Sequence, residues 1–98
     1  MEKGIPHFRL LRIKQLLQAG KVRTTHSARA GASELGLTSS GMLDILMKLE
    51  PIDFYKSMTT YADHTVWQDV YCPVTSVGQI YLKLTVMEDV LIVSFKER

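Results

Sequence analysis

The chain of 98 residues is 46% hydrophobic and 22% charged with a net charge of +2, values that exclude wholesale disorder and allow one hydrophobic core. No apolar run is long enough to span a membrane, and the charged start MEKGIPHFRLLRIKQ excludes a signal peptide. One cysteine, Cys72, excludes an intramolecular disulfide and a structural zinc site, so we expect a single cytoplasmic domain, residues 1–98, without metal or cofactor.

Apolar residues in the first part of the chain recur at helical spacing. The first predicted helix has Pro6 in its first turn and ends at Gly20. Its buried apolar stripe consists of Leu10, Ile13, Leu16 and Leu17. Residues 21–24, which follow, predict a short edge strand.

Two further helices are predicted before residue 51. The first of them ends at Gly36 and can be capped by Thr24, Thr25 or Ser27. The second buries Met42, Ile45, Leu46 and Leu49, and can be capped by Thr38 or Ser39. It must close by Glu50, because Pro51 disfavours helical geometry in the residue before it.

The basic residues are concentrated near the start of the chain. Residues 1–29 contain seven basic residues and one acidic residue, a net of +6, whereas residues 30–98 contain five and nine, a net of −4. A basic segment can attract a polyanion such as nucleic acid, although a solvated helix face is the simpler explanation on charge alone. The candidate RNA-binding residues of this segment are Arg9, Arg12, Arg23 and Arg29.

From Phe54 onward the apolar residues alternate with a period of two, as they do in strands. Residues 54–71 predict two strands with a tight connection, and residues 78–96 predict a second pair. A two-residue connection at Met87–Glu88 would put Tyr81 opposite Ser94 and diagonal to Lys96 on the polar side of this pair. The predicted fold class is α+β, with N-terminal helices packed on an antiparallel sheet of about four strands.

A DNA-binding module is the alternative function. Residues 32–49, ASELGLTSSGMLDILMKL, have the look of a helix-turn-helix, and the strands that follow could form the wing of a winged helix. A recognition helix needs Arg, Lys, Asn or Gln facing the major groove, but the exposed positions here offer Ser39, Ser40, Asp44 and Lys48. Two packed amphipathic helices explain the pattern better, and a winged-helix-like regulator or corepressor without nuclease activity is kept as the alternative.

The polar side of the predicted sheet has the chemistry for RNA cleavage. A loop of three or five residues after Tyr61 would put Lys56 and Gln68 on one face, and a loop of four would separate them. With Tyr81 and Lys96, this face would carry two ammonium groups, a phenol and an amide, which suit phosphate charge, proton transfer and base contact. RNA brings its own nucleophile, the 2′-hydroxyl. Ordinary exposed strand residues are the simpler alternative at this stage.

Six segments carry a resemblance to a known family: MEK-x-x-PH at the start, VRTT at 22–25, ELGL at 34–37, FYKSMTTYADHTVWQDVY at 54–71, GQIYLK at 78–83 and VLIVSFKE at 90–97. Over essentially its whole length the chain resembles the MqsR (motility quorum-sensing regulator) family of bacterial toxins. It departs from the family at Cys72, where a basic residue is known, and across residues 27–53.

The resemblance implies a RelE-like α+β fold and a metal-independent, sequence-selective mRNA interferase with GCU-type sites. It implies catalytic roles for Lys56, Gln68, Tyr81 and Lys96, and no metal site. It also implies a zinc-binding, DNA-binding antitoxin, MqsA, that neutralises the toxin, so that operator DNA would be contacted only through the antitoxin complex.

Overall fold

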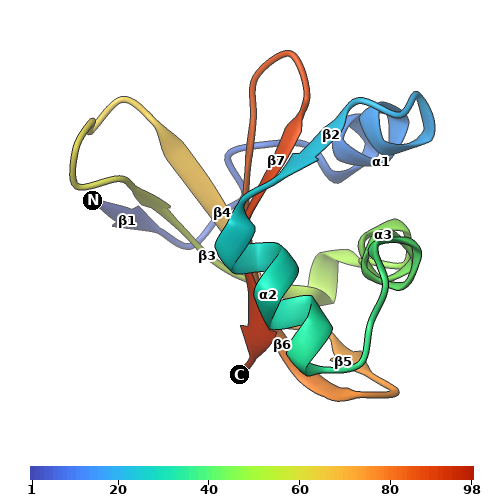
Figure 1. Cartoon of the computed structure of the whole chain (residues 1–98). Helices are drawn as coiled ribbons and strands as arrows, with labels where there is room; N and C mark the ends of the chain where they lie inside the picture. The colour runs from blue at the N-terminus through green and yellow to red at the C-terminus, as the bar shows by residue number, and fades with distance from the viewer.

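Three helices pack against one side of a mixed β-sheet in the computed structural model, which describes residues 1–98 (Figure 1). The helices are α1 (Leu10–Gln18), α2 (His26–Glu34) and α3 (Ser39–Met47), followed by a short 3₁₀ turn, η1 (Pro51–Asp53). The strands are β1 (Glu2–Lys3), β2 (Val22–Thr24), β3 (Phe54–Thr59), β4 (Trp67–Tyr71), β5 (Val74–Thr75), β6 (Gly78–Val86) and β7 (Val90–Glu97). This is the predicted α+β class.

Four of the six helix ends follow local chemistry. Thr25 and Thr38 cap α2 and α3, each accepting a hydrogen bond from a backbone N–H three residues on. Gly20 and Gly36 end α1 and α2 with φ of 74° and 77°, the left-handed conformation that favours glycine. None of the three helices is long and apolar enough to cross a membrane.

The prediction that Pro6 starts the first helix is wrong, because α1 begins four residues later, at Leu10. The backbone N–H groups of His7 and Phe8 donate to the Asp69 carboxylate on β4 instead. This contact, which the local sequence does not show, holds the segment before α1 against the sheet.

Helix α2 crosses β7 so closely that only glycine fits at the crossing. A Cβ added to Gly31 would lie 1.8 Å from the backbone oxygen of Phe95. We expect Gly31→Ala to lower the free energy of unfolding by about 2–3 kcal/mol, because two backbones would have to separate. Chemical denaturation checks this.

The matched control is Gly41→Ala in α3. Its added Cβ would meet the flexible Leu37 side chain at 3.3 Å and Thr38 Oγ1 at an ordinary 3.7 Å. Alanine is the better helix former by about 0.5–1 kcal/mol, so this variant should be as stable as the parent or slightly more so. Equal destabilisation at both positions would contradict the proposed close crossing.

The strand order is β1-β3-β4-β6-β7-β2, with β5 pairing β6 beside this path. The predicted antiparallel meander is confirmed as β3, β4, β6 and β7. The predicted edge strand is also confirmed, as β2, which pairs in parallel with β7 and makes the sheet mixed. Strands β1 and β5 are two residues each, too short to give a sequence pattern.

The predicted register of the last two strands is wrong. The connection has three residues, since Val86 pairs with Val90, and a bulge at Val93 shifts the pairing further. The bulge has a physical reason: Val90, Ile92 and Phe95 are all buried, and strict alternation could not bury all three. As a result Tyr81 lies directly opposite Lys96.

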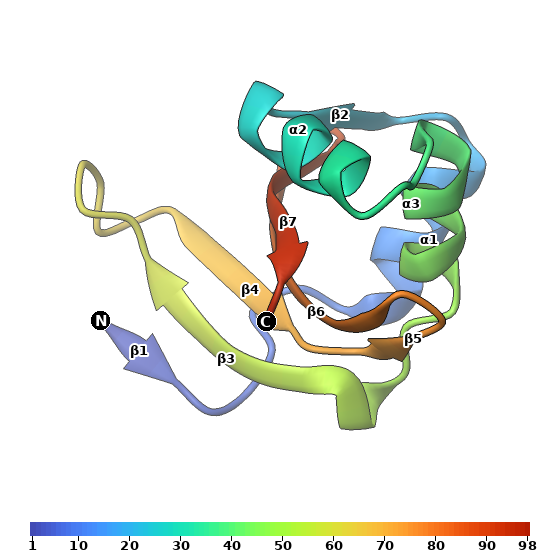
Figure 2. The ribbon, with the colours of Figure 1, turned by 60° about the horizontal axis from the view of Figure 1, so that its bottom comes forward.

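The core lies between the helices and the inner face of the sheet. It joins residues of α1, α2 and α3 to Ile80, Leu82, Leu84, Ile92 and Phe95, all nearly or fully inaccessible to solvent. The helices gather over the β6–β7–β2 side, whereas β1, β3 and the loop after β3 extend beyond them (Figure 2). The other face of the sheet is left open.

Candidate active site

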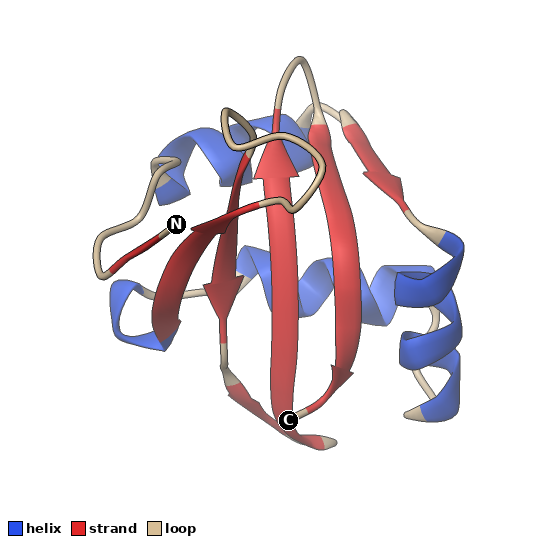
Figure 3. Cartoon of the chain, turned by 90° about the vertical axis from the view of Figure 1, so that its left-hand side faces the viewer, coloured by secondary structure: helices blue, strands red, loops and turns tan.

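The open face of the sheet carries the four predicted catalytic residues (Figure 3 views this face). The Thr60 N–H donates to the Val66 carbonyl, and Met58 pairs with Gln68 and Lys56 with Val70. This register puts Tyr61 opposite Thr65 and so corresponds to the predicted loop of three residues after Tyr61. Val70 in turn pairs with Lys83, which shares a side of β6 with Tyr81. The predicted shared face is therefore confirmed. We call it the lysine face, and its residues are Lys56, Gln68, Val70, Tyr81, Lys83 and Lys96.

Lys56 forms an ion pair that the sequence did not predict. Its Nζ lies 2.9 Å from a carboxylate oxygen of Glu2, because β1 pairs antiparallel with β3. The hydrogen bond that the Lys56 ammonium donates to the Glu2 carboxylate is the main cause that raises the pKa of Lys56, and the same bond lowers the pKa of Glu2. A hollow of about 420 Å³ adjoins this pair, lined in part by Tyr55 and Gly4. A ligand phosphate would compete with Glu2 for Lys56.

Tyr81 and Lys96 form a pair on the neighbouring strands. The Lys96 ammonium lies 5.3 Å from the centroid of the Tyr81 ring, a cation–π contact. Lys96 also lines a hollow of about 270 Å³ between β7 and α2, opposite Glu34. Sequence reasoning placed these two residues on one face, and the corrected register brings them closer than predicted.

Lys83 lies at the centre of the lysine face and was not among the predicted site residues. It pairs with Val70 on one side and Ser94 on the other. It is half-buried, and burial is the largest cause that lowers its pKa, followed by the positive charges of Lys96 and Lys56. The strict alternation of residues 79–85 already assigned it to the polar side, so the signal was present in the sequence.

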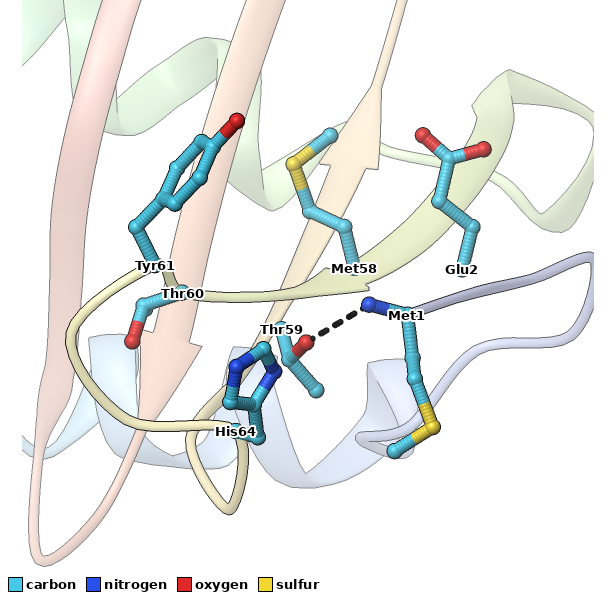
Figure 4. Close-up of a pocket in the computed structure, with 7 residues that line it drawn as sticks. All are labelled: Met1, Glu2, Met58, Thr59, Thr60, Tyr61 and His64. Atoms are coloured by element: carbon cyan, nitrogen blue, oxygen red, sulfur yellow. Dashed lines mark hydrogen bonds between the residues drawn. The ribbon is translucent and has the colours of Figure 1, made fainter.

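A hollow of about 400 Å³ lies at the outer end of β3 (Figure 4). The side chains of Glu2, Met58 and Tyr61 point to the same side of it (Figure 4), and the Tyr61 side chain is fully exposed. The Met1 ammonium donates to Thr59 Oγ1 at 2.9 Å and closes the other wall. Because Met58 is the cross-strand partner of Gln68, the hollow continues the lysine face.

The four predicted RNA-binding arginines do not gather at the lysine face. Arg9 and Arg12 belong to the helical layer behind the sheet, and Arg29 lies on the exposed side of α2. Arg23 is bound to Asp89, with its Nε 2.7 Å from the carboxylate. This pairing raises the pKa of Arg23 and lowers that of Asp89. RNA contact by these four residues stays a prediction.

Asp69 anchors the start of the chain to the back of the site. It is fully buried and accepts hydrogen bonds from Ser57 Oγ at 2.6 Å and from the backbone N–H groups of His7 and Phe8 at 3.0–3.1 Å. The His7 ring then stacks on Trp67, with centroids 5.3 Å apart. Since β1 begins this anchored segment, Asp69 indirectly holds Glu2 beside Lys56. No local sequence signal reveals this role.

No three His, Cys, Asp or Glu side chains form a group that could hold a metal ion. Cys72 is buried, and burial raises the pKa of its thiol, which keeps it protonated at neutral pH.

An α+β domain with an open sheet face bearing lysines and a tyrosine is the arrangement expected of a RelE-like toxin. The sequence model of the family described as "Motility quorum-sensing regulator, toxin of MqsA" matches residues 5–97, and the chain belongs to this family. The mRNA interferase toxin MqsR of Escherichia coli (strain K12) is 60% identical to the chain over 98 residues, all of both proteins. The predicted family and fold class are confirmed. The relative is named an mRNA interferase, which is the kind of endoribonuclease predicted for this chain.

Proposed function

We propose that this chain is the toxin of a toxin–antitoxin pair and acts as an mRNA interferase, an endoribonuclease that cuts mRNA and so stops translation and growth. The observation that carries the proposal is the lysine face, where four strands bring together Lys56, Gln68, Tyr81 and Lys96. The 60% identity to a named mRNA interferase over the whole chain supports it.

The proposed reaction uses the RNA's own 2′-hydroxyl as nucleophile. Its attack on the adjacent phosphate gives a 2′,3′-cyclic phosphate and a 5′-hydroxyl. Lys56 and Lys96 stabilise the negative charge that develops on the phosphate. Tyr81 orients the nucleotide or exchanges a proton, and Gln68 contacts a base or sugar.

Substrate selection would use the surfaces around the lysine face. We expect single-stranded mRNA with GCU-type sites in the cytoplasm, with bases reaching the hollow beside Met58 and Tyr61. The exposed Arg9, Arg12 and Arg29, with Arg23, would extend the phosphate path around the edges of the domain.

The proposed partner is a zinc-binding antitoxin of the MqsA type. It would neutralise the toxin, and the chain would reach operator DNA only as part of that complex. The family description, a toxin of MqsA, supports this partner.

No contact in the structure favours the DNA-binding alternative. Met42 and Leu46 of α3 are buried against the core, which leaves Ser39, Ser40, Asp44 and Lys48 exposed. These side chains are poorly suited to recognising base edges in the major groove. Sequence-specific DNA binding by the chain alone would favour the alternative.

Cleavage in the presence of EDTA tests the proposal directly. We expect the purified chain to cut a defined mRNA in EDTA as fast as with added Mg²⁺, because the face offers cations in place of a metal. Mapped ends should carry a 2′,3′-cyclic phosphate and a 5′-hydroxyl. Intact RNA, or cleavage only with added metal, would contradict it.

A further inference from the structure

Lys83 lies among the four predicted residues on the lysine face. Gln68 is diagonal to it across β4, because Lys83 pairs with Val70. On its own strand Lys83 lies two residues from Tyr81, and across β7 it is diagonal to Lys96. Across β4 it shares Val70 as a neighbour with Lys56, at about two strand spacings, ~10 Å. Val70 is fully buried although it lies on the open face, which agrees with lysine stems covering it from both sides.

Lys83 also has no anionic partner within the protein. The two ion pairs of the structure join Lys56 to Glu2 and Arg23 to Asp89. Lys96 lies over the Tyr81 ring. A half-buried ammonium without a carboxylate, next to two further ammonium groups, is an unfavourable arrangement in the free protein. A phosphate on this face would relieve it.

We propose that Lys83 is a catalytic residue of this chain and donates the proton that the 5′-oxygen of the leaving nucleotide needs. This inference rests on the proposed function. As the 2′-oxygen bonds to phosphorus, the bond from phosphorus to the 5′-oxygen breaks and its electron pair stays on that oxygen. The Lys83 ammonium gives this oxygen its proton. The 2′-hydroxyl proton passes to solvent, and the Lys83 amine regains a proton from solvent before the next cycle.

The surroundings of Lys83 suit an acid better than those of Lys56. Burial and the charges of Lys96 and Lys56 lower the pKa of Lys83, so its ammonium gives up a proton more readily than an ordinary lysine does. The Glu2 carboxylate has the opposite effect on Lys56, whose pKa is raised. The two lysines therefore have different roles in the proposed reaction: Lys56 stays positively charged and stabilises the phosphate, whereas Lys83 donates a proton.

The test compares two oligonucleotides that differ only in the leaving atom at one cleavable site, the ordinary 5′-oxygen or a bridging 5′-sulfur. A thiolate leaves without a proton, since thiol pKa values lie near ~8.5. We expect Lys83→Met to cut the oxygen substrate about 100-fold more slowly than the parent, and to cut the sulfur substrate at nearly the parental rate. Lys83→Arg should behave in the same way, because arginine keeps the charge but does not release a proton.

Two controls separate this role from others. Lys56→Met should be slow on both substrates, because stabilising phosphate charge is needed whichever atom leaves. Lys48→Met, at the exposed C-cap position that follows α3, should match the parent on both. Circular dichroism and thermal melting establish that each variant is folded.

Three outcomes would overturn the inference: parental rates for Lys83→Met on the oxygen substrate, equal slowing on both substrates, or full activity of Lys83→Arg on the oxygen substrate. If the parent cuts neither substrate, the proposed function fails rather than the role of Lys83 within it.

Discussion

Lys56→Ala and Tyr81→Ala are each expected to slow RNA cleavage by about 100- to 1,000-fold while the chain stays folded. Removing one group that stabilises transition-state charge typically has an effect of this size. Neither side chain belongs to the core, because both lie on the open face of the sheet. The exposed Lys56–Glu2 ion pair adds little stability, so its loss should not unfold the domain.

The measurement has two parts, the rate of cleavage of a defined mRNA and the growth of cells that express each variant. We expect both variants to relieve the growth arrest caused by the parent. Lys48→Ala is the matched control for charge, since it removes a lysine from the helical layer rather than from the lysine face. If Lys56→Ala and Tyr81→Ala remain as toxic as the parent, the site assignment is wrong.

Much of the fold was predictable because its determinants are local. Thr25, Thr38, Gly20 and Gly36 set helix ends through contacts within a few residues. The alternation in residues 78–86 set the inner and outer sides of β6 in the same way. These patterns depend on short-range backbone geometry, so they can be recognised from neighbouring residues in the sequence.

The parts that were not predictable depend on contacts between distant residues. The bulge at Val93 allows Phe95 to pack in the core under the helices, and no pattern within residues 90–97 predicts it. Strand β1 has two residues, and it is fixed by pairing with Ser57 and Met58 more than fifty positions later. For that reason the Glu2 carboxylate beside Lys56 was missed.

The candidate site was predictable in part for a simple reason of parity. Lys56 and Gln68 share a face because the loop between their strands has an odd number of residues, one of the two lengths that the sequence left open. Lys83 belongs to the predicted polar side of β6, but its central position on the face follows only from its pairing with Val70 and Ser94.

Asp69→Ala should cause the largest loss of stability that we predict, about 3–4 kcal/mol in the free energy of unfolding. The change leaves the N–H groups of His7 and Phe8 without their acceptor, and it leaves the buried Ser57 hydroxyl only its longer contact with the Gln68 carbonyl, at 3.3 Å. Each unpaired buried donor costs about 1–3 kcal/mol, and water entering the vacated space recovers some of the total. Urea denaturation measures the loss.

The same variant should release the start of the chain before the rest unfolds, because Asp69 holds residues 7 and 8 against β4. Hydrogen exchange at the His7 and Phe8 amides should therefore rise more than exchange in the centre of β6. Asp63→Ala is the control: Asp63 also accepts hydrogen bonds, but from Thr65 in an exposed loop, and its removal should leave the unfolding curve nearly unchanged. Equal stability of the two variants would mean that Asp69 does not anchor this segment, and Glu2 would then need another reason to lie beside Lys56.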